Sequence, residues 1–154
     1  MSTGDIEQHD VFKVLQGLTF FQGLAEDDLK QLSSLGRWVQ IPKGSTICRT
    51  EAPAKSCYLI IDGLVSLEMC TAKTGCATIL TVGKGDLLSW SPLLGKEKLT
   101  ANAYALDDTQ LIEFDAAELV ALCDRNVRLG YQLMRATADA VAKRLMACLL
   151  YTSP

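Results

Sequence analysis

A series of short segments in which apolar and polar residues alternate runs through the middle of the chain and limits the folds open to it. These segments lie between residues 38 and 114. Successive side chains of a strand point to opposite faces, so the alternation predicts strands. Asp62-Gly63, between two of them, is a strong signal for a tight hairpin. Many short strands separated by glycine turns predict an antiparallel jelly roll or β-roll. We expect strands at 38–41, 46–48, 57–61, 64–69, 77–82, 101–105 and 110–114.

Helical patterns flank this β region on both sides. Residues 11–35 carry apolar side chains three to four positions apart, and Asp27 and Asp28 stand where a helix start favours negative charge. After the β region, Asp115 is an expected helix cap, and an uninterrupted helical pattern continues from about Asn126. The fold class predicted is α+β, mainly β: an antiparallel roll between N-terminal helices and a long C-terminal dimerisation helix.

The chain has 154 residues, of which 49% are hydrophobic and 21% charged, which is ordinary for one soluble domain. We expect a flexible leader at 1–10, a domain of helices, β-roll and short helix at 11–125, a long helix at 126–150 and a tail at 151–154 that could be non-native. The leader is polar, and no apolar run reaches the roughly 20 residues that a membrane span needs. A cytoplasmic location without a membrane partner is therefore expected.

Four motifs resemble those of the cyclic-nucleotide-binding domain of Crp/Fnr regulators and follow in the same order. They are Pro-Lys-Gly at 42–44, the hairpin at 58–65, Gly-Asp at 85–86 and Phe-Asp at 114–115. The resemblance covers residues 12 to about 147. It implies a bacterial sensor domain of a transcription regulator, in which the roll binds a small effector and the long helix pairs with a second chain.

The stretch 85–94 resembles the phosphate-binding cassette of this family without its two decisive polar side chains. In the family, a Glu hydrogen-bonds the ribose and an Arg pairs with the cyclic phosphate; here these positions align with Trp90 and Leu99. A buried phosphate needs a fixed cation, so cAMP and cGMP are expected to bind weakly or not at all. Lys98 is the best candidate for a substitute cation, and the favoured alternative is that Lys96 and Lys98 are both solvated loop charges.

Two uses of the altered pocket stay open at this point. Trp90 could stack on a flat ligand or fill the vacated space as core. The N–H groups at the start of the cassette's short helix could still hold an anion, and Ser89 and Ser91 add hydroxyl groups. No cofactor is expected, and the small effector, if there is one, is unknown. The candidate ligand-binding residues are Leu88, Ser89, Trp90, Ser91, Leu93, Lys98, Leu99 and Thr100.

The C-terminal helix carries two apolar stripes. The first repeats with the seven-residue period of a coiled coil. A second stripe, made of Leu129, Leu133, Ala136 and Ala140, follows a neighbouring face. One stripe can pack on the roll while the other meets a second chain, which predicts a homodimer; one wide stripe docked within the chain is the alternative. The seam residues are Val127, Tyr131, Met134, Ala138, Val141, Leu145 and Cys148.

In Crp/Fnr regulators the long helix leads into a helix-turn-helix domain that reads DNA. The present sequence stops at Pro154, as either a stand-alone sensor or a regulator whose DNA-binding half is missing. The net charge of −3 indicates no basic face. DNA is expected as a partner only if a further C-terminal domain exists.

Patterns of catalytic and metal-binding residues are missing from the sequence. The six cysteines form no C-x-x-C pair and no zinc spacing, and a cytoplasmic location argues against disulfides, so we expect buried free thiols. The single histidine, His9, lies outside the β region, which opposes a metal-binding cupin barrel and a nucleophile–base pair. No catalytic residue, metal site or enzyme activity is predicted. The expected function is effector sensing without tight cAMP binding; the alternative is a dimerisation or interaction module that senses nothing.

Overall fold

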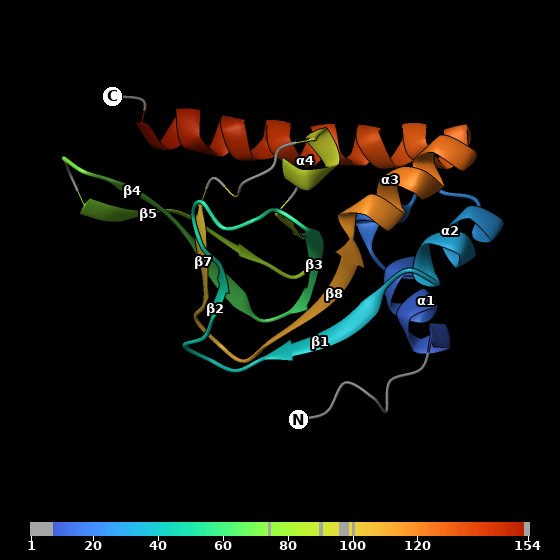
Figure 1. Cartoon of the computed structure of the whole chain (residues 1–154), viewed down its shortest axis with the longest axis horizontal. Coiled ribbons are helices and arrows are strands. Elements are labelled where there is room, and N and C mark those ends of the chain that lie inside the picture. The colour runs from blue at the N-terminus through green and yellow to red at the C-terminus, as the bar shows by residue number, and fades with distance from the viewer. Residues whose placement is uncertain (1–7, 74, 90, 96–98, 100, 153–154) are drawn as a thin grey trace.

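The computed structural model describes residues 8–152 except 74, 90, 96–98 and 100. Two four-stranded antiparallel sheets form a roll, with short helices at one end and a long helix along one side (Figure 1). The first sheet has the order β1 (Arg37–Ile41), β8 (Thr109–Asp115), β3 (Ser56–Asp62) and β6 (Leu87–Leu88). The second has the order β2 (Thr46–Cys48), β7 (Asn102–Ala105), β4 (Leu64–Thr71) and β5 (Gly75–Gly83). The predicted fold class is confirmed.

All seven expected strands are present. Successive side chains of a strand point to opposite faces, so the two faces of the first sheet contribute to two separate cores. In the first sheet, Ile60 and Leu111 point into the roll, whereas their neighbours Leu59 and Ile112 point to the helices. Strand β6 was not predicted, because two residues are too short to show any period. It pairs with β3 through Tyr58↔Leu88 and Leu59↔Leu87.

The N-terminal helical pattern forms three short helices, α1 (Gln8–Gln16), η1 (Thr19–Phe21) and α2 (Glu26–Ser33). Their buried side chains include Leu15, which is fully buried, and Leu32, which is 1% exposed. These residues cover the outer face of the first sheet and belong to the same core as Ile112. The helices thus close the end of the roll opposite the β4–β5 hairpin (Figure 1).

Two further helices follow the roll, α3 (Ala116–Arg125) and α4 (Val127–Thr152). The Asp115 carboxylate accepts a hydrogen bond from the backbone N–H of Glu118 at 3.0 Å, which is the predicted cap. Gly130 lies where α4 crosses α3: a Cβ there would be 3.0 Å from the Cβ of Cys123. Glycine at this point is therefore a packing requirement of the crossing.

A buried carboxylate fixes the start of α4 to α2. Asp28, 2% exposed, accepts hydrogen bonds from Arg128 Nε at 2.9 Å and from Arg128 Nη2 at 3.0 Å. It also accepts one from Asn126 Nδ2 at 2.9 Å, while Asn126 Oδ1 caps α4 by accepting from the N–H of Leu129. The hydrogen bonds from Arg128 lower the pKa of the Asp28 carboxyl. The direction of the long helix is thus set at its first turn.

Candidate functional site

A cavity of about 270 Å³ lies between the roll and the C-terminal half of α4. The β4–β5 hairpin supplies one wall, with Leu67 and Met69 from β4, and α4 supplies another, with Val141 and Leu145. Of the described residues that line the cavity, only Ser89 and Arg144 have polar side chains besides the thiol of Cys48. The site is therefore an apolar chamber with one cation.

The structure brings together three of the predicted ligand-binding residues at this cavity. Leu88 and Leu99 line it and belong to the core inside the roll. Ser89 also lines it; at φ +59° it turns the chain after β6, and its Oγ donates to the Ser56 carbonyl oxygen at 2.9 Å. Leu93, in η2 (Ser91–Leu94), instead packs against the core beneath the helices.

The other candidates cannot be placed at the cavity. Trp90, Lys98 and Thr100 lie outside the described residues, and the Ser91 side chain is also not described. Ligand binding by the predicted set stays a prediction.

Sequence reasoning missed Arg144, the only charged side chain among the described residues of the cavity. Its Nη2 is buried and has no hydrogen-bond partner in the described part of the protein. Burial lowers the pKa of this guanidinium, and the charge of Asp86 acts in the opposite direction. The sequence did hold a signal, because Arg144 follows Ala140 by four residues and so continues the apolar stripe that faces the roll. A charge on that stripe needs an explanation.

A larger groove of about 940 Å³ runs beside the cavity, between η1, β5 and α4, and Arg144 lines both spaces. The described charged residues along this groove carry both signs. Lys143 on α4 pairs with Asp139 at 3.0 Å. Asp86 lies at the turn before β6, where its Oδ2 accepts from the backbone N–H of Gly83 at 2.8 Å.

The two stripes of α4 are in different surroundings. Leu129 is fully buried and Leu133 is 4% exposed, so the second stripe packs against the body of the domain. On the seam, Val127, Tyr131 and Leu145 are 73%, 61% and 59% exposed. Ala138 is also exposed, Met134 and Val141 are half-buried, and the Cys148 side chain is not described. The homodimer stays a prediction, with a mostly exposed apolar seam available for it.

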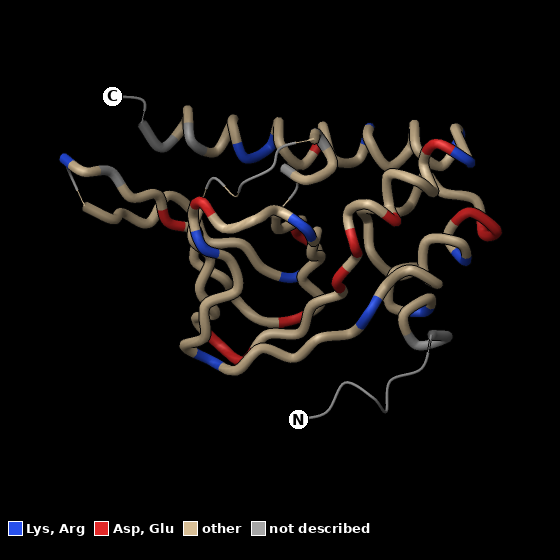
Figure 2. Tube along the Cα trace, viewed as in Figure 1, with Lys and Arg blue, Asp and Glu red and all other residues tan. Residues whose placement is uncertain are grey.

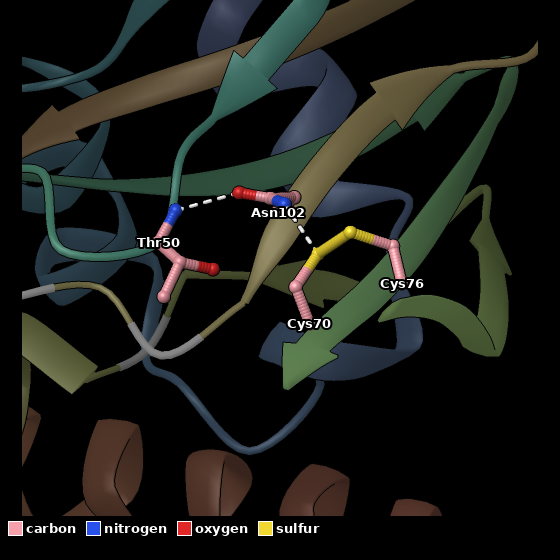
Figure 3. Close-up of a disulfide and its surroundings, with 4 residues drawn as sticks. All are labelled: Thr50, Cys70, Cys76 and Asn102. Carbon is pink, nitrogen blue, oxygen red and sulfur yellow. Dashed lines mark hydrogen bonds between the residues drawn. A yellow bond between two sulfur atoms is a disulfide. The ribbon is translucent and has the colours of Figure 1, made fainter. Parts of the chain in front are cut away.

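The expectation that the cysteines are free thiols was wrong for Cys70 and Cys76, which form a disulfide between β4 and β5 (Figure 3). The hairpin register places them directly opposite each other, with 3.9 Å between their Cα atoms. Asn102 on β7 donates to Cys70 Sγ at 3.3 Å and accepts from the N–H of Thr50 at 2.6 Å. The hairpin register, which the cysteine spacing alone does not reveal, brings the two thiols together and outweighs the argument from compartment.

The two buried free cysteines are poorly suited to act as nucleophiles. Cys48 and Cys57 are buried free thiols as expected, and burial raises the pKa of each to about 12, which disfavours the reactive thiolate. The carboxylate of Glu68 and the sulfurs of Cys70 and Cys76 lie within 4.8 Å of one another, a spacing that could hold a metal ion. The disulfide occupies both sulfurs, so these atoms could serve as ligands only after reduction.

Comparison with known proteins identifies the family. Residues 38–126 match the sequence profile described as "Cyclic nucleotide-binding domain", which covers more than half of the chain. The chain therefore belongs to the cyclic nucleotide-binding domain family. The cyclic AMP receptor protein of Thermus thermophilus is 26% identical over 131 residues, which cover 85% of this chain and 59% of that protein. The chain spans less than two thirds of the length of the curated relatives it matches.

Solved structures with the same fold include sensor domains. A cyclic nucleotide-binding domain from Methylobacillus flagellatus has a TM-score of 0.82 at 16% identity, covering 94% of this chain and 82% of that one. The sensor domain of the transcriptional regulator DNR from Pseudomonas aeruginosa has a TM-score of 0.72 at 20% identity, covering 90% and 93%. At these identities the likeness concerns the fold alone. In the described part of the chain, no helix combines the length and apolar character needed to cross a bilayer.

Proposed function

We propose that this chain is an effector-sensing regulatory domain of the Crp/Fnr type whose pocket takes a small, largely apolar molecule and binds cAMP only weakly. The observation that supports this most is the cavity of about 270 Å³ that is lined by both the roll and α4. A ligand there contacts the sensor body and the helix expected to form the dimer. It can shift the helix to the extent that it binds one arrangement more tightly than another.

Weak cAMP binding follows from the uncharged side chain at the family's phosphate-binding position and from the largely apolar described walls that would face the hydroxylated ribose. Leu99 lines the cavity without a charge. Loss of a buried charged partner typically costs about 2–5 kcal/mol, enough to move a micromolar dissociation constant towards millimolar. Titration calorimetry with cAMP and cGMP should find no low-micromolar binding, and such binding would contradict this part of the proposal.

Sensing itself can be tested by filling the cavity. Ala101 lines it, whereas Ala142 is exposed on α4 and does not. Ala101→Phe should abolish thermal stabilisation by small-molecule ligands that stabilise the parent protein, whereas Ala142→Phe should leave it unchanged. If a broad screen finds no stabilising ligand, or if Ala101→Phe leaves the stabilisation intact, the pocket does not sense. The exposed seam would then favour the alternative, a module that only dimerises.

Direct DNA reading is not proposed for the described residues. Lys and Arg are interspersed with Asp and Glu over helices and strands, with no continuous basic stripe along α4 (Figure 2). Protein–DNA affinity depends on neutralising several phosphates at once. We expect no catalysis either, and regulation through an additional domain or a partner chain is the role that the fold supports.

A further inference from the structure

The clearest unexplained feature of the molecule is the buried side of the Arg144 guanidinium. A guanidinium stays charged in proteins and carries five N–H donors. The Nη2 of Arg144 is buried and donates to nothing in the part of the chain that the structure describes. An unpaired buried donor is costly, and more so when it is charged. A side chain kept in this state is suited to a partner that arrives from outside.

The nearby described acids are already engaged. Asp86, whose charge acts on Arg144, holds the turn before β6 by accepting from the N–H of Gly83 at 2.8 Å. Asp139, five residues before Arg144 on α4, pairs with Lys143 at 3.0 Å. Neither carboxylate makes a hydrogen bond or an ion pair with Arg144. The cation therefore faces the cavity without an internal counter-ion among these groups.

The remaining described surroundings are apolar. Leu67 and Met69 from β4, Leu99 beside the cassette and Val141 from α4 line the same cavity of about 270 Å³. Such walls favour a hydrocarbon or aromatic body and disfavour a hydroxylated one. The ligand that satisfies both parts of the chamber has one anionic end and one apolar end.

We propose that this pocket binds a compact ligand with an apolar body and a single oxyanion head group, and that Arg144 of α4 holds the head group. The inference deepens the proposed sensing function and rests on it. The cation comes from the long helix, so binding acts on α4 directly. Arg144 lines the cavity, and the next residue, Leu145, is 59% exposed on the predicted seam. The bound ligand and the partner chain of the predicted dimer would therefore contact adjacent residues of α4.

The test uses pairs of probes that differ in charge and little in shape: indole-3-acetate with indole-3-acetamide, and octanoate with octanamide. Calorimetry on the full chain should show tighter binding of an acid than of its amide, by about tenfold or more. Arg144→Gln should weaken binding of the acid far more than binding of the amide and so remove this preference. Lys143→Gln, at an exposed neighbouring position, is the control and should keep the preference.

Each outcome decides the matter. Equal affinity of acid and amide, unaltered in Arg144→Gln, would overturn the head-group inference while leaving an apolar sensing pocket intact. The inference would also be overturned if none of the four probes bound at millimolar concentration. If the ligand screen were negative as well, the proposed sensing function would be contradicted too. Should Arg144→Gln fail to fold, Arg144→Lys keeps the charge but not the planar fork. It should then retain the preference for the acid with weaker binding, and loss of the preference in this variant would contradict the inference.

Discussion

Removing the Cys70–Cys76 disulfide is expected to lower the free energy of unfolding by about 2 kcal/mol. The two cysteines are six positions apart in sequence, so the bridge closes a short loop. A cross-link of this length removes roughly 7 cal/mol/K of entropy from the unfolded chain in the chain-entropy relation, or about 2 kcal/mol at 25 °C. The folded state loses little, because both cysteines are exposed and the hydrogen bond from Asn102 Nδ2 to sulfur is weak.

Urea denaturation of the oxidised protein and of Cys70→Ala/Cys76→Ala measures this difference. Reductant should destabilise the parent protein by the same amount and leave the double variant unchanged. Lys73→Ala, exposed in the same turn with the bridge intact, is the control and should change the free energy of unfolding by less than about 0.5 kcal/mol. In denaturant, the reduced parent protein should titrate two more thiols than the oxidised one.

Two results would refute the reasoning. One is equal stability of parent and double variant under oxidising conditions, with no effect of reductant. The other is a loss well above about 2 kcal/mol, which would mean that the bridge holds native packing. The second result bears on function, because Met69 and Ile79 of the bridged hairpin line the cavity. Loss of probe binding in the double variant would then follow.

Three further predictions concern the core, the tight turn and the seam. Hydrogen bonds from Arg128 hold the pKa of the Asp28 carboxyl below its usual value, so the pair contributes stability at neutral pH that is lost as the pH falls through the folded-state pKa. The urea midpoints of the parent and Asp28→Asn should differ at pH 7, begin to approach each other below about pH 4 and meet only below the folded-state pKa. Gly63 has φ +112°, and a Cβ there would lie 2.7 Å from the Cα of Thr109; Gly63→Ala should therefore cost about 2–4 kcal/mol in urea denaturation, and a neutral result would contradict the turn geometry. Tyr131 is 61% exposed on the seam, so Tyr131→Glu should fold normally and sediment as a monomer, whereas a monomeric parent at tens of micromolar (roughly the range of weak interfaces) would disprove the dimer.

The strands were readable from the sequence because apolar and polar residues alternate along most of them, although β3 lies between two cores and is buried on both faces. Leu59 and Ile60 are both apolar and both buried, yet they belong to different cores, and only the polar positions around them reveal the period. The strands with such neighbours were all found. Strand β6 was not, since its existence depends on pairing with β3 and not on any local pattern.

The candidate site was less accessible to sequence reasoning. Leu88 and Leu99 were found at the cavity because a family resemblance placed the cassette, although Leu93 from the same reasoning packs elsewhere. Arg144 was overlooked because the stripe on its face was counted only through Ala140, where apolar residues end. A search for what interrupts an apolar stripe would have found it, since a charge in such a place requires either solvent or a partner.

The long helix has a fixed part and an exposed part, and the cavity lies along the second. Its first turn is held by the buried Asp28, and Leu129, Leu133 and Thr137 pack into the domain. Beyond Thr137, most described positions are half-buried or exposed. A ligand that pairs with Arg144 therefore acts on the part of α4 where fewer contacts resist a displacement of the helix. The helix would rotate about its first turn, which is fixed by Asp28. Leu145 of the predicted seam follows Arg144 directly. A small displacement of this helical turn would therefore move both the seam residue and the guanidinium that holds the head group. An effector would influence dimerisation in this way only if it bound the two arrangements of the turn with different affinity.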